Sequence, residues 1–271
     1  MTERITSREN GRIKQYGKLR TSAKARWEAG RFVMEGHRLC VDALESGVRL
    51  ESFFYTENYF SQHEDTVRRM TEICENACQI TDSVAARLAD TKSPQGIFCI
   101  GQTLDKSKHL VTIKKNNSYL ALEEIADPNN LGTILRTAEA FSVDGILLSR
   151  SCCDLYAPKV LRGSMGAFFR LKTEIVEDLA AFLEQEREKG IPSFAAVPDR
   201  AAQSILTADF SEGGIMLIGN EANGLRRETA EAATYKVTIP MRGGAESLNA
   251  AVAASILIWQ MEAGRRNSRS E

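Results

Sequence analysis

No run of about 18 apolar residues occurs in the 271-residue chain, so we expect no membrane span. The N-terminal residues contain no apolar core of the kind found in secretory signals, and we expect no such signal. Histidine is scarce, and the three copies (His37, His63 and His109) all lie in the first 109 residues. Catalysis by histidine in the rest of the chain is therefore disfavoured, and surface or packing roles are the better interpretation.

Charge of one sign does not dominate, because 35 Lys/Arg residues stand against 36 Asp/Glu residues, a net charge of −1. This balance excludes a uniformly basic coat for nucleic acid but not a local basic patch. The six cysteines are scattered, which is typical of reduced thiols and predicts a cytoplasmic protein without a disulfide framework. Cys74 and Cys78 have no second pair near them in the sequence, so no metal site is expected.

Glycine-rich nucleotide-binding signatures are also absent. The chain contains no GxGxxG after a strand, no GxxxxGK(S/T) and no GxSxG. A dinucleotide-dependent oxidoreductase is one alternative for a chain of this kind, and it lacks its fingerprint here.

The composition, with 43% hydrophobic and 26% charged residues, is that of an ordinary globular protein, and the length predicts about two domains. Residues 1–38 carry ten Lys/Arg and four Asp/Glu residues, a net charge of +6. Residues 39–105 carry five Lys/Arg and eleven Asp/Glu residues, a net charge of −6. The basic lead segment suits a phosphate backbone, with Lys14 and Lys18 as candidate contacts. The alternative interpretation is a solvated helix face.

Residues 1–105 alternate strand and helix patterns and predict a small α/β domain. The expected strands are 32–34, 50–55, 79–81 and 97–101, and the expected helices are 12–29, 37–45, 67–76 and 83–89. Residues 106–117 are polar and lysine-rich and are expected to form a linker.

Residues 118–265 show a second α/β pattern. The expected strands are 119–122, 145–148, 193–197, 215–218 and 236–239, and the expected helices are 131–141, 156–164, 176–189, 226–232 and 247–263. Each strand is a short, nearly continuous apolar run, which is typical of parallel strands buried on both faces.

Three polar, glycine-bearing segments follow strands of this second domain. They are DPNNLGTILRTA (127–138), GNEANGL (219–225) and MRGGAESLNAAVA (241–253). In the first, Asn130 is placed to cap the following helix, and Arg136 lies nearly two turns further along. Loops at the carboxyl ends of parallel strands are where α/β folds bind ligands, so three such loops could converge on one site. Alone, each segment also has an ordinary interpretation as a capped helix or a braced loop.

These segments, extended to DPNNLGTILRTA, IGNEANGL and IPMRGGAESLNAAVA, resemble the three motifs of the SpoU (TrmH-type) RNA 2′-O-ribose methyltransferases of the SPOUT superfamily. The resemblance covers residues 119–262. The pieces ITSRENGRIKQYGKLR, FVMEGHRLCVDALESG and LADTKSPQGIFCI also resemble that family's N-terminal substrate-binding domain.

The resemblance implies a SPOUT domain with a parallel sheet and a deep trefoil knot, preceded by a smaller α/β RNA-binding domain. It implies S-adenosylmethionine as the cofactor, and no metal, because the methyl donor is already a cation. The residues expected to contact the cofactor are Gly219, Asn220, Ile239, Met241 and Leu248.

The resemblance also assigns the residues of the chemical step. Arg136 orients the ribose 2′-hydroxyl and stabilises developing alkoxide charge; a role as general base is disfavoured because a guanidinium keeps its proton. Asn130 is expected to fix the loop that carries Arg136. Glu221, Ser247 and Asn249 are expected to hold Arg136 and the ribose, with helix capping and loop bracing as the alternative.

As partners, the family resemblance implies RNA and a second copy of the chain, joined as a homodimer through the knotted domains. Lys159 and Arg162 are further candidate contacts to RNA phosphates. The two-domain layout with a basic lead segment favours large-subunit (23S) ribosomal RNA as the substrate. The alternatives are a tRNA 2′-O-methyltransferase and a non-catalytic RNA-binding or ribosome-assembly protein of the same fold.

Overall fold

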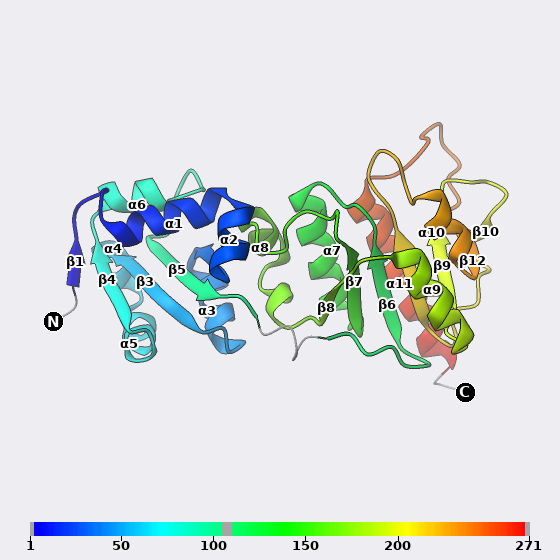
Figure 1. The fold of residues 1–271 in the computed structure, drawn as a ribbon, viewed down its shortest axis with the longest axis horizontal. Coiled ribbons are helices and arrows are strands. Elements are labelled where there is room, and N and C mark those ends of the chain that lie inside the picture. The colour runs from blue at the N-terminus through cyan, green and yellow to red at the C-terminus, as the bar shows by residue number, and fades with distance from the viewer. Residues whose placement is uncertain (1–2, 105–109, 269–271) are drawn as a thin grey trace. The chain divides into compact units, whose positions relative to one another are not determined.

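The computed structural model describes residues 3–104 and 110–268, with side chains up to residue 265. The chain forms two compact units (Figure 1). The first consists of Met1–Leu104 with Asp154–Arg170, and the second of Asp105–Cys153 with Leu171–Glu271. Within the described residues no helix is long and apolar enough to cross a membrane.

The first unit is built on a five-stranded mixed sheet with the order β1-β4-β3-β5-β2. Its strands are β1 (Glu3–Ile5), β2 (Arg31–Glu35), β3 (Leu50–Thr56), β4 (Asn76–Ile80) and β5 (Ile97–Gln102). β4 pairs with β1 and β3 in parallel, whereas β5 pairs with β2 and β3 antiparallel.

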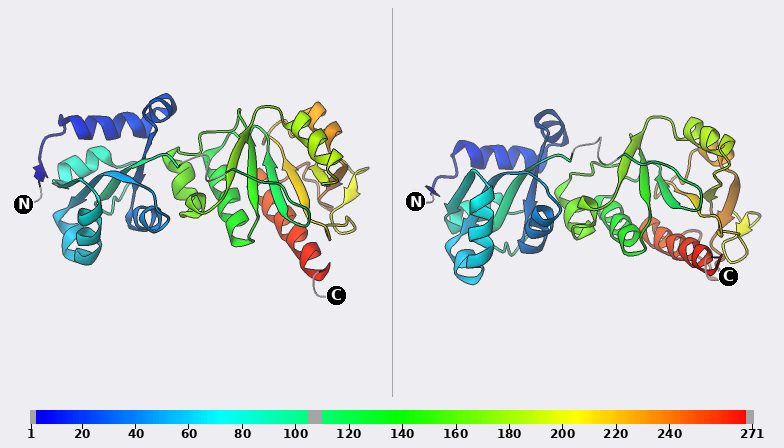
Figure 2. Two further views of the ribbon diagram at one scale, coloured as in Figure 1. Left: turned by 60° about the horizontal axis from the view of Figure 1, so that its bottom comes forward. Right: turned by 90° about the horizontal axis from the view of Figure 1, so that it is seen from below.

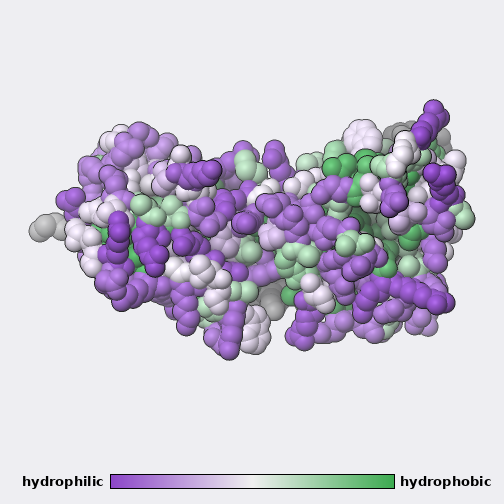
Figure 3. All heavy atoms as spheres, turned by 90° about the horizontal axis from the view of Figure 1, so that it is seen from above, coloured by the Kyte–Doolittle hydropathy of each residue, from purple (hydrophilic) through white to green (hydrophobic). Residues whose placement is uncertain are grey.

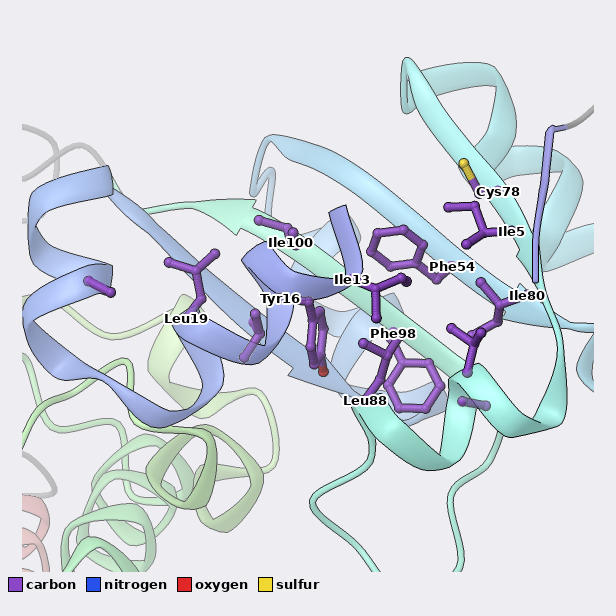
Figure 4. Packing of buried hydrophobic residues seen from close by; sticks show 14 residues of the cluster. Ile5, Ile13, Tyr16, Leu19, Phe54, Cys78, Ile80, Leu88, Phe98 and Ile100 are labelled. Carbon is purple, nitrogen blue, oxygen red and sulfur yellow. The ribbon is translucent and has the colours of Figure 1, made fainter. Parts of the chain in front are cut away.

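Helices cover this sheet. They are α1 (Gly11–Thr21), α2 (Ala23–Ala29), α3 (His37–Glu45), α4 (Glu57–Gln62), α5 (Glu64–Ile73), α6 (Asp82–Leu88) and α8 (Pro158–Ser164), with a 3₁₀ turn η2 at Ala167–Phe169. One apolar core joins α1, α2 and α6 to the sheet. Ile13, Tyr16 and Leu19 of α1 belong to this core, and Figure 4 shows Ile13 and Tyr16 beside Phe54 and Phe98. Their spacing of three residues places them on one side of the helix, which is the helical period that the sequence displayed.

The expected helix at 12–29 is two helices. Ser22 adopts extended backbone angles between them, and its hydroxyl accepts a hydrogen bond from the Ala25 N–H at 3.1 Å. Ser22 thus caps α2 and ends α1, as a serine at an N-cap position does. The helix expected at 67–76 is also shifted, because it begins at Glu64 and ends at Ile73. β1 and α4 were not predicted.

In the structure, Asp154–Arg170 packs with the first unit, although it lies within the segment 118–265 that the sequence predicts as one domain. The buried Arg26 guanidinium donates to Asp154 at 2.7 Å. Phe32 of β2 packs against Tyr156 and Phe169, with ring centroids 4.9 and 6.0 Å apart. These contacts join residues that are far apart in the chain, so composition and local pattern could not reveal them.

The second unit contains a seven-stranded sheet in which every pairing is parallel. Its order is β10-β12-β9-β11-β6-β7-β8, with bounds β6 (Ser118–Leu122), β7 (Gly145–Ser149), β8 (Thr173–Val176), β9 (Ser193–Ala196), β10 (Gln203–Ser204), β11 (Gly214–Ile218) and β12 (Tyr235–Thr238). All five expected strands are present. β8 and β10 were not predicted, and Val176, expected to begin a helix, ends β8 instead.

The second unit carries helices on both faces of its sheet (Figure 2). These helices are α7 (Pro128–Ala140), α9 (Leu179–Glu188), α10 (Arg227–Ala232) and α11 (Ala250–Ser268). α7 and α11 contact each other on one face, and α9 contacts α10 on the other. Because β6, β7 and β11 are buried along their whole length, the sheet is the rigid centre of this unit.

The Arg26–Asp154 pair provides a test of this packing. The Arg26 side chain is only 7% exposed, so Asp154→Ala should leave a buried guanidinium without its carboxylate. We expect the free energy of unfolding to fall by about 2–4 kcal/mol in urea denaturation. Glu9→Ala is the matched control, because it removes the acid of an exposed pair with Lys14, and it should change stability by less than about 1 kcal/mol. Equal effects of the two substitutions would contradict the assignment.

Candidate functional site

The three polar segments singled out in the sequence follow β6, β11 and β12. β11 lies beside β6, and β9 separates β11 from β12. All these strands run in parallel, so the segments leave the sheet at the same edge. This is the reason that segments more than a hundred residues apart meet.

A pocket of about 280 Å³ lies among these segments. Its walls are largely apolar and come from Ile218, Val237, Ala253 and Leu257. All five residues expected to contact the cofactor line it: Gly219, Asn220, Ile239, Met241 and Leu248. Glu221 and Ser247 line it as well. Figure 3 shows apolar atoms gathered in a recess of the second unit.

Gly219 is where the loop after β11 folds back on itself. A Cβ atom built on Gly219 would lie 2.1 Å from the carbonyl carbon of Gly224 and 2.2 Å from the N–H nitrogen of Leu225. Asn220 and Gly224 exchange two backbone hydrogen bonds of 3.0 and 2.9 Å, and Gly224 has a φ of +70°. Only glycine allows this closure, because any side chain at 219 would collide with backbone.

The Asn220 side chain braces the same loop. Its Oδ1 accepts hydrogen bonds from the N–H groups of Ala222 and Asn223, and its Nδ2 donates to the Glu124 carbonyl at 2.8 Å. The side-chain oxygen and one amide hydrogen are therefore used within the protein. Asn220 shapes the pocket wall and connects it to the end of β6.

A chain of hydrogen bonds joins all three motifs. Asn249 Oδ1 accepts from the N–H groups of Ala251 and Val252, and so caps α11. Asn249 Nδ2 donates to Asn130 Oδ1 at 3.0 Å, and Asn130 Nδ2 donates to Glu221 Oε1 at 2.9 Å. We call Glu221, Asn130 and Asn249 the motif bridge. In the side-chain amides of Asn130 and Asn249, both the oxygen and the nitrogen form hydrogen bonds. Each amide therefore has one defined orientation.

Glu221 is the acceptor at one end of this bridge. Besides the Asn130 amide, its carboxylate accepts from the N–H groups of Ala126 and Asp127, both at 3.1 Å. Burial raises the pKa of Glu221, but the hydrogen bonds from Asn130, Asp127 and Ala126 act the other way, and the net pKa lies below the ordinary glutamate value. The ionised carboxylate is thus the form that the site stabilises.

The expectation that Asn130 caps α7 is wrong. The cap is Asp127, whose Oδ1 accepts from the Asn129 N–H at 2.8 Å, and Pro128 occupies the first helical turn. Asn130 lies inside the helix, is only 7% exposed, and turns its amide toward Glu221 and Asn249. A buried amide costs free energy unless it is hydrogen-bonded, and here the motif bridge provides the partners.

Arg136 and Ser247 are not part of the motif bridge. Arg136 is exposed on α7, does not line the pocket, and forms no hydrogen bond or ion pair with the residues that the structure describes. Ser247 is exposed in the loop before α11 and lines the pocket. The structure therefore brings Asn130, Glu221 and Asn249 together, and leaves Arg136 apart from the pocket of its own chain.

The basic lead segment divides into structural and exposed cations. Arg12 binds Glu3, Arg20 binds carbonyls at the end of α6, Arg26 binds Asp154, and Arg31 binds Glu51. The candidate contacts Lys14 and Lys18 are exposed, and Lys14 pairs with Glu9 at 2.7 Å. Of the other two candidates, Lys159 is exposed, and Arg162 pairs with Asp90 at 2.5 Å.

Glu123 braces the pocket loop, and sequence reasoning missed it. It is fully buried at the end of β6, and its N–H donates to the Ile218 carbonyl where the pocket loop begins. Its carboxylate accepts from the N–H and Nε of Arg226, at 2.7 and 2.9 Å, and from the Thr229 hydroxyl at 2.6 Å. The Glu123 N–H thus fixes the start of the loop 219–225, and the Glu123 carboxylate fixes its end. An acid directly after an apolar strand was the only signal in the sequence.

Comparisons with known proteins were made for the whole chain. Residues 117–259 match the family model of the SpoU rRNA methylase family, and residues 10–99 match that of the MRM3-like substrate binding domain. The chain is 32% identical over 257 residues to an uncharacterized tRNA/rRNA methyltransferase of Synechocystis sp., covering 94% of this chain and 92% of the relative.

Two further relatives match along almost their whole length. The 23S rRNA (guanosine(2553)-2′-O)-methyltransferase RlmP of Bacillus subtilis is 28% identical, with 96% of this chain and 99% of that protein covered. The crystal structure of an AdoMet-bound rRNA methyltransferase from Sinorhizobium meliloti has a TM-score of 0.83 and 28% identity, with 98% of both chains covered.

The closure at Gly219 generates a prediction about the pocket. In Gly219→Ala, the added methyl group would overlap with backbone atoms of Gly224 and Leu225, so the loop has to open. We expect the free energy of unfolding to fall by about 1–3 kcal/mol and the affinity for S-adenosylhomocysteine to fall at least about tenfold in calorimetric titration. Gly243→Ala is the matched control, because nothing lies within 4 Å of a Cβ there. An unchanged affinity in Gly219→Ala would contradict the closure.

The lowered pKa of Glu221 generates a pH prediction. Ionised Glu221 contributes stability above the ordinary glutamate pKa of 4.5, and this contribution is lost as the pH falls through the lower pKa of the folded state. In the Glu221→Gln variant, the side chain has only one acceptor oxygen, and its NH2 group faces an N–H donor. We therefore expect this variant to be less stable than the parent protein at neutral pH. Urea denaturation at a series of pH values should show that the difference in the free energy of unfolding between the parent and Glu221→Gln becomes smaller in acid. A constant difference at all pH values would be the contrary result.

Proposed function

Because the chain belongs to the SpoU rRNA methylase family, we propose that it methylates a ribose 2′-hydroxyl of large-subunit (23S) ribosomal RNA. The members of this family are RNA methyltransferases, and their cofactor is S-adenosylmethionine. The observation that carries the proposal is that one pocket collects all five expected cofactor residues, while the motif bridge ties the three motifs around it.

The residues of the pocket fit the cofactor. Its volume of about 280 Å³ lies just below the range of about 300–1,000 Å³ for small-molecule sites. Ile239 and Leu248 supply apolar surface for an adenine ring, and the closed loop at Gly219 brings backbone N–H and C=O groups to the wall. S-adenosylmethionine supplies a methyl group on a cationic sulfur. The residues of the protein hold and orient the two reactants.

The ribose hydroxyl is a weak acid: as its oxygen bonded to the methyl carbon, the carbon–sulfur bond would break to leave a neutral thioether, and the hydroxyl proton would pass to solvent water. We assign Arg136 to this step. Its guanidinium keeps its proton, so it donates hydrogen bonds to the hydroxyl oxygen and a neighbouring phosphate and stabilises developing alkoxide charge. Ser247 is proposed to contact the ribose, because it is exposed and lines the pocket. Asn130, Glu221 and Asn249 act as positioning residues, because their side chains bind each other and the backbone.

The proposed active form is a homodimer joined through the second unit. α11 exposes Val252 (49%) and Trp259 (55%), and Trp259 packs edge-on against Phe141 at the end of α7. Such exposed apolar surface favours an interface. Arg136 is exposed on α7, which packs against α11, and does not line the pocket of its own chain. In the proposed dimer it serves the pocket of the second subunit. The trefoil knot of the second unit is likewise part of the proposal.

Ribosomal RNA is preferred over transfer RNA because of the similarity to the 23S rRNA enzyme RlmP. That similarity spans both units, including the segment that matches a substrate-binding domain. Lys14, Lys18, Lys159 and Arg162 are proposed as contacts to RNA phosphates. The six free cysteines are consistent with the proposed cytoplasmic location. A non-catalytic RNA-binding role is disfavoured by the intact motif bridge.

The proposal is tested by complementation of a strain that lacks this gene. Mapping of 2′-O-methylation in all cellular RNA should show one 23S rRNA position that the parent gene restores. Arg136→Ala should leave it unmethylated, with S-adenosylhomocysteine affinity within a few-fold of the parent, because the guanidinium does not line the pocket of its own chain and is proposed to contact the ribose and phosphate, not the cofactor. Arg227→Ala, which removes an exposed arginine of α10, is the matched control and should restore methylation. Restoration by Arg136→Ala, or loss of a tRNA position instead, would contradict the assignment.

A further inference from the structure

Trp27 is the most exposed of the large hydrophobic side chains in the described residues. Its exposed fraction is 79%, compared with 55% for Trp259, and its ring packs on no other aromatic ring among those residues. A tryptophan that buries its ring stabilises a protein substantially. Leaving it in solvent forgoes this gain and keeps the ring free to contact a binding partner.

The backbone that carries Trp27 is held firmly on both sides. Ser22 caps the start of α2, and Gly30 ends the helix in a left-handed conformation with a φ of +60°. The neighbouring Arg26 is buried and donates to Asp154 and to the Leu19 carbonyl. The ring is therefore displayed from a fixed platform, which lowers the entropy cost of binding.

Exposed lysines lie on the helix that carries Trp27 and on the helix before it. The core cluster that contains Val33 of β2 also contains Leu19 of α1 and Ala25 of α2, so both helices cover the same face of the sheet. Their outer sides therefore face away from that sheet together. They expose Lys14, Lys18 and Lys24, which with Trp27 we call the lysine face. Lys14 and Lys24 pair with Glu9 and Glu28, and Lys18 has no hydrogen bond or ion pair with the described residues.

We propose that Trp27 stacks on an unpaired base of the RNA substrate, with the lysine face on the flanking phosphates. This rests on the proposed function and specifies its substrate further: the RNA presents a single-stranded base to the first unit. An aromatic ring beside cations is the arrangement that binds single-stranded nucleic acid. A protein partner is disfavoured, because lysine is depleted in protein interfaces.

The chain has two tryptophans, which permits a direct test. In a Trp259→Phe protein, Trp27 is the only tryptophan, and stacking on a base should quench its fluorescence. We expect titration with an oligouridine to quench the emission. A blunt RNA duplex of equal length should cause little quenching, because its bases are already stacked.

Affinity is measured separately, by fluorescence anisotropy of a labelled oligouridine with an otherwise unaltered chain. Trp27→Ala should weaken binding about tenfold, and Trp27→Phe, which keeps an aromatic face, should recover most of the loss. Ile73→Ala is the matched control, because it removes another exposed apolar side chain of the same unit outside the lysine face. It should bind like the parent.

Several results would overturn the inference. These are unchanged emission on binding, equal affinity of Trp27→Ala and the parent, equal quenching by duplex, or no binding of oligouridine by the parent. A blue shift of Trp27 emission with rising protein concentration and no RNA would indicate a protein partner instead. Failure of the proposed function is distinguishable, since the parent itself would then restore no 2′-O-methylation in cells.

Discussion

The motif bridge is the interaction on which the candidate site depends. The loops after β6, β11 and β12 are polar, and each leaves the sheet separately, so apolar packing alone does not fix them together. The Glu221 carboxylate holds two N–H groups before α7, Asn130 spans from that carboxylate to Asn249, and Asn249 caps α11. One continuous set of hydrogen bonds thus positions the start of both helices and the wall of the pocket.

Around this bridge, two further features make the pocket a fixed shape. Gly219 and Gly224 close the loop on itself, and Glu123 anchors its two ends to β6 and α10. The carboxylate of Glu123 is buried, but it accepts from two groups of Arg226 and from Thr229, which offsets the cost of burying its charge. A site formed in advance in this way loses little entropy when a small molecule binds.

The sequence predicted the five central strands of the second unit because their apolar runs are nearly continuous, as burial on both faces requires. It did not reveal β8, whose Thr173 and Glu174 break the apolar pattern at the sheet edge. Asn130 was misplaced because Asp127, Asn129 and Asn130 are all residue types that cap helices, and the Asp127–Pro128 pair was the stronger signal. The cofactor residues came from family resemblance. The partners of Glu123 lie 103 and 106 residues away, and no local pattern contains such information.

The central claim is that the motif bridge, and not only the residues in contact with the cofactor, builds the site. Asn130 does not line the pocket, so calorimetric titration of Asn130→Leu with S-adenosylhomocysteine tests it most directly. This change keeps the volume of the side chain and removes both bridging hydrogen bonds. The account predicts a fall in affinity of about tenfold or more, equivalent to the loss of about 1.4 kcal/mol. Affinity equal to that of the parent, in a variant that remains folded, would contradict it.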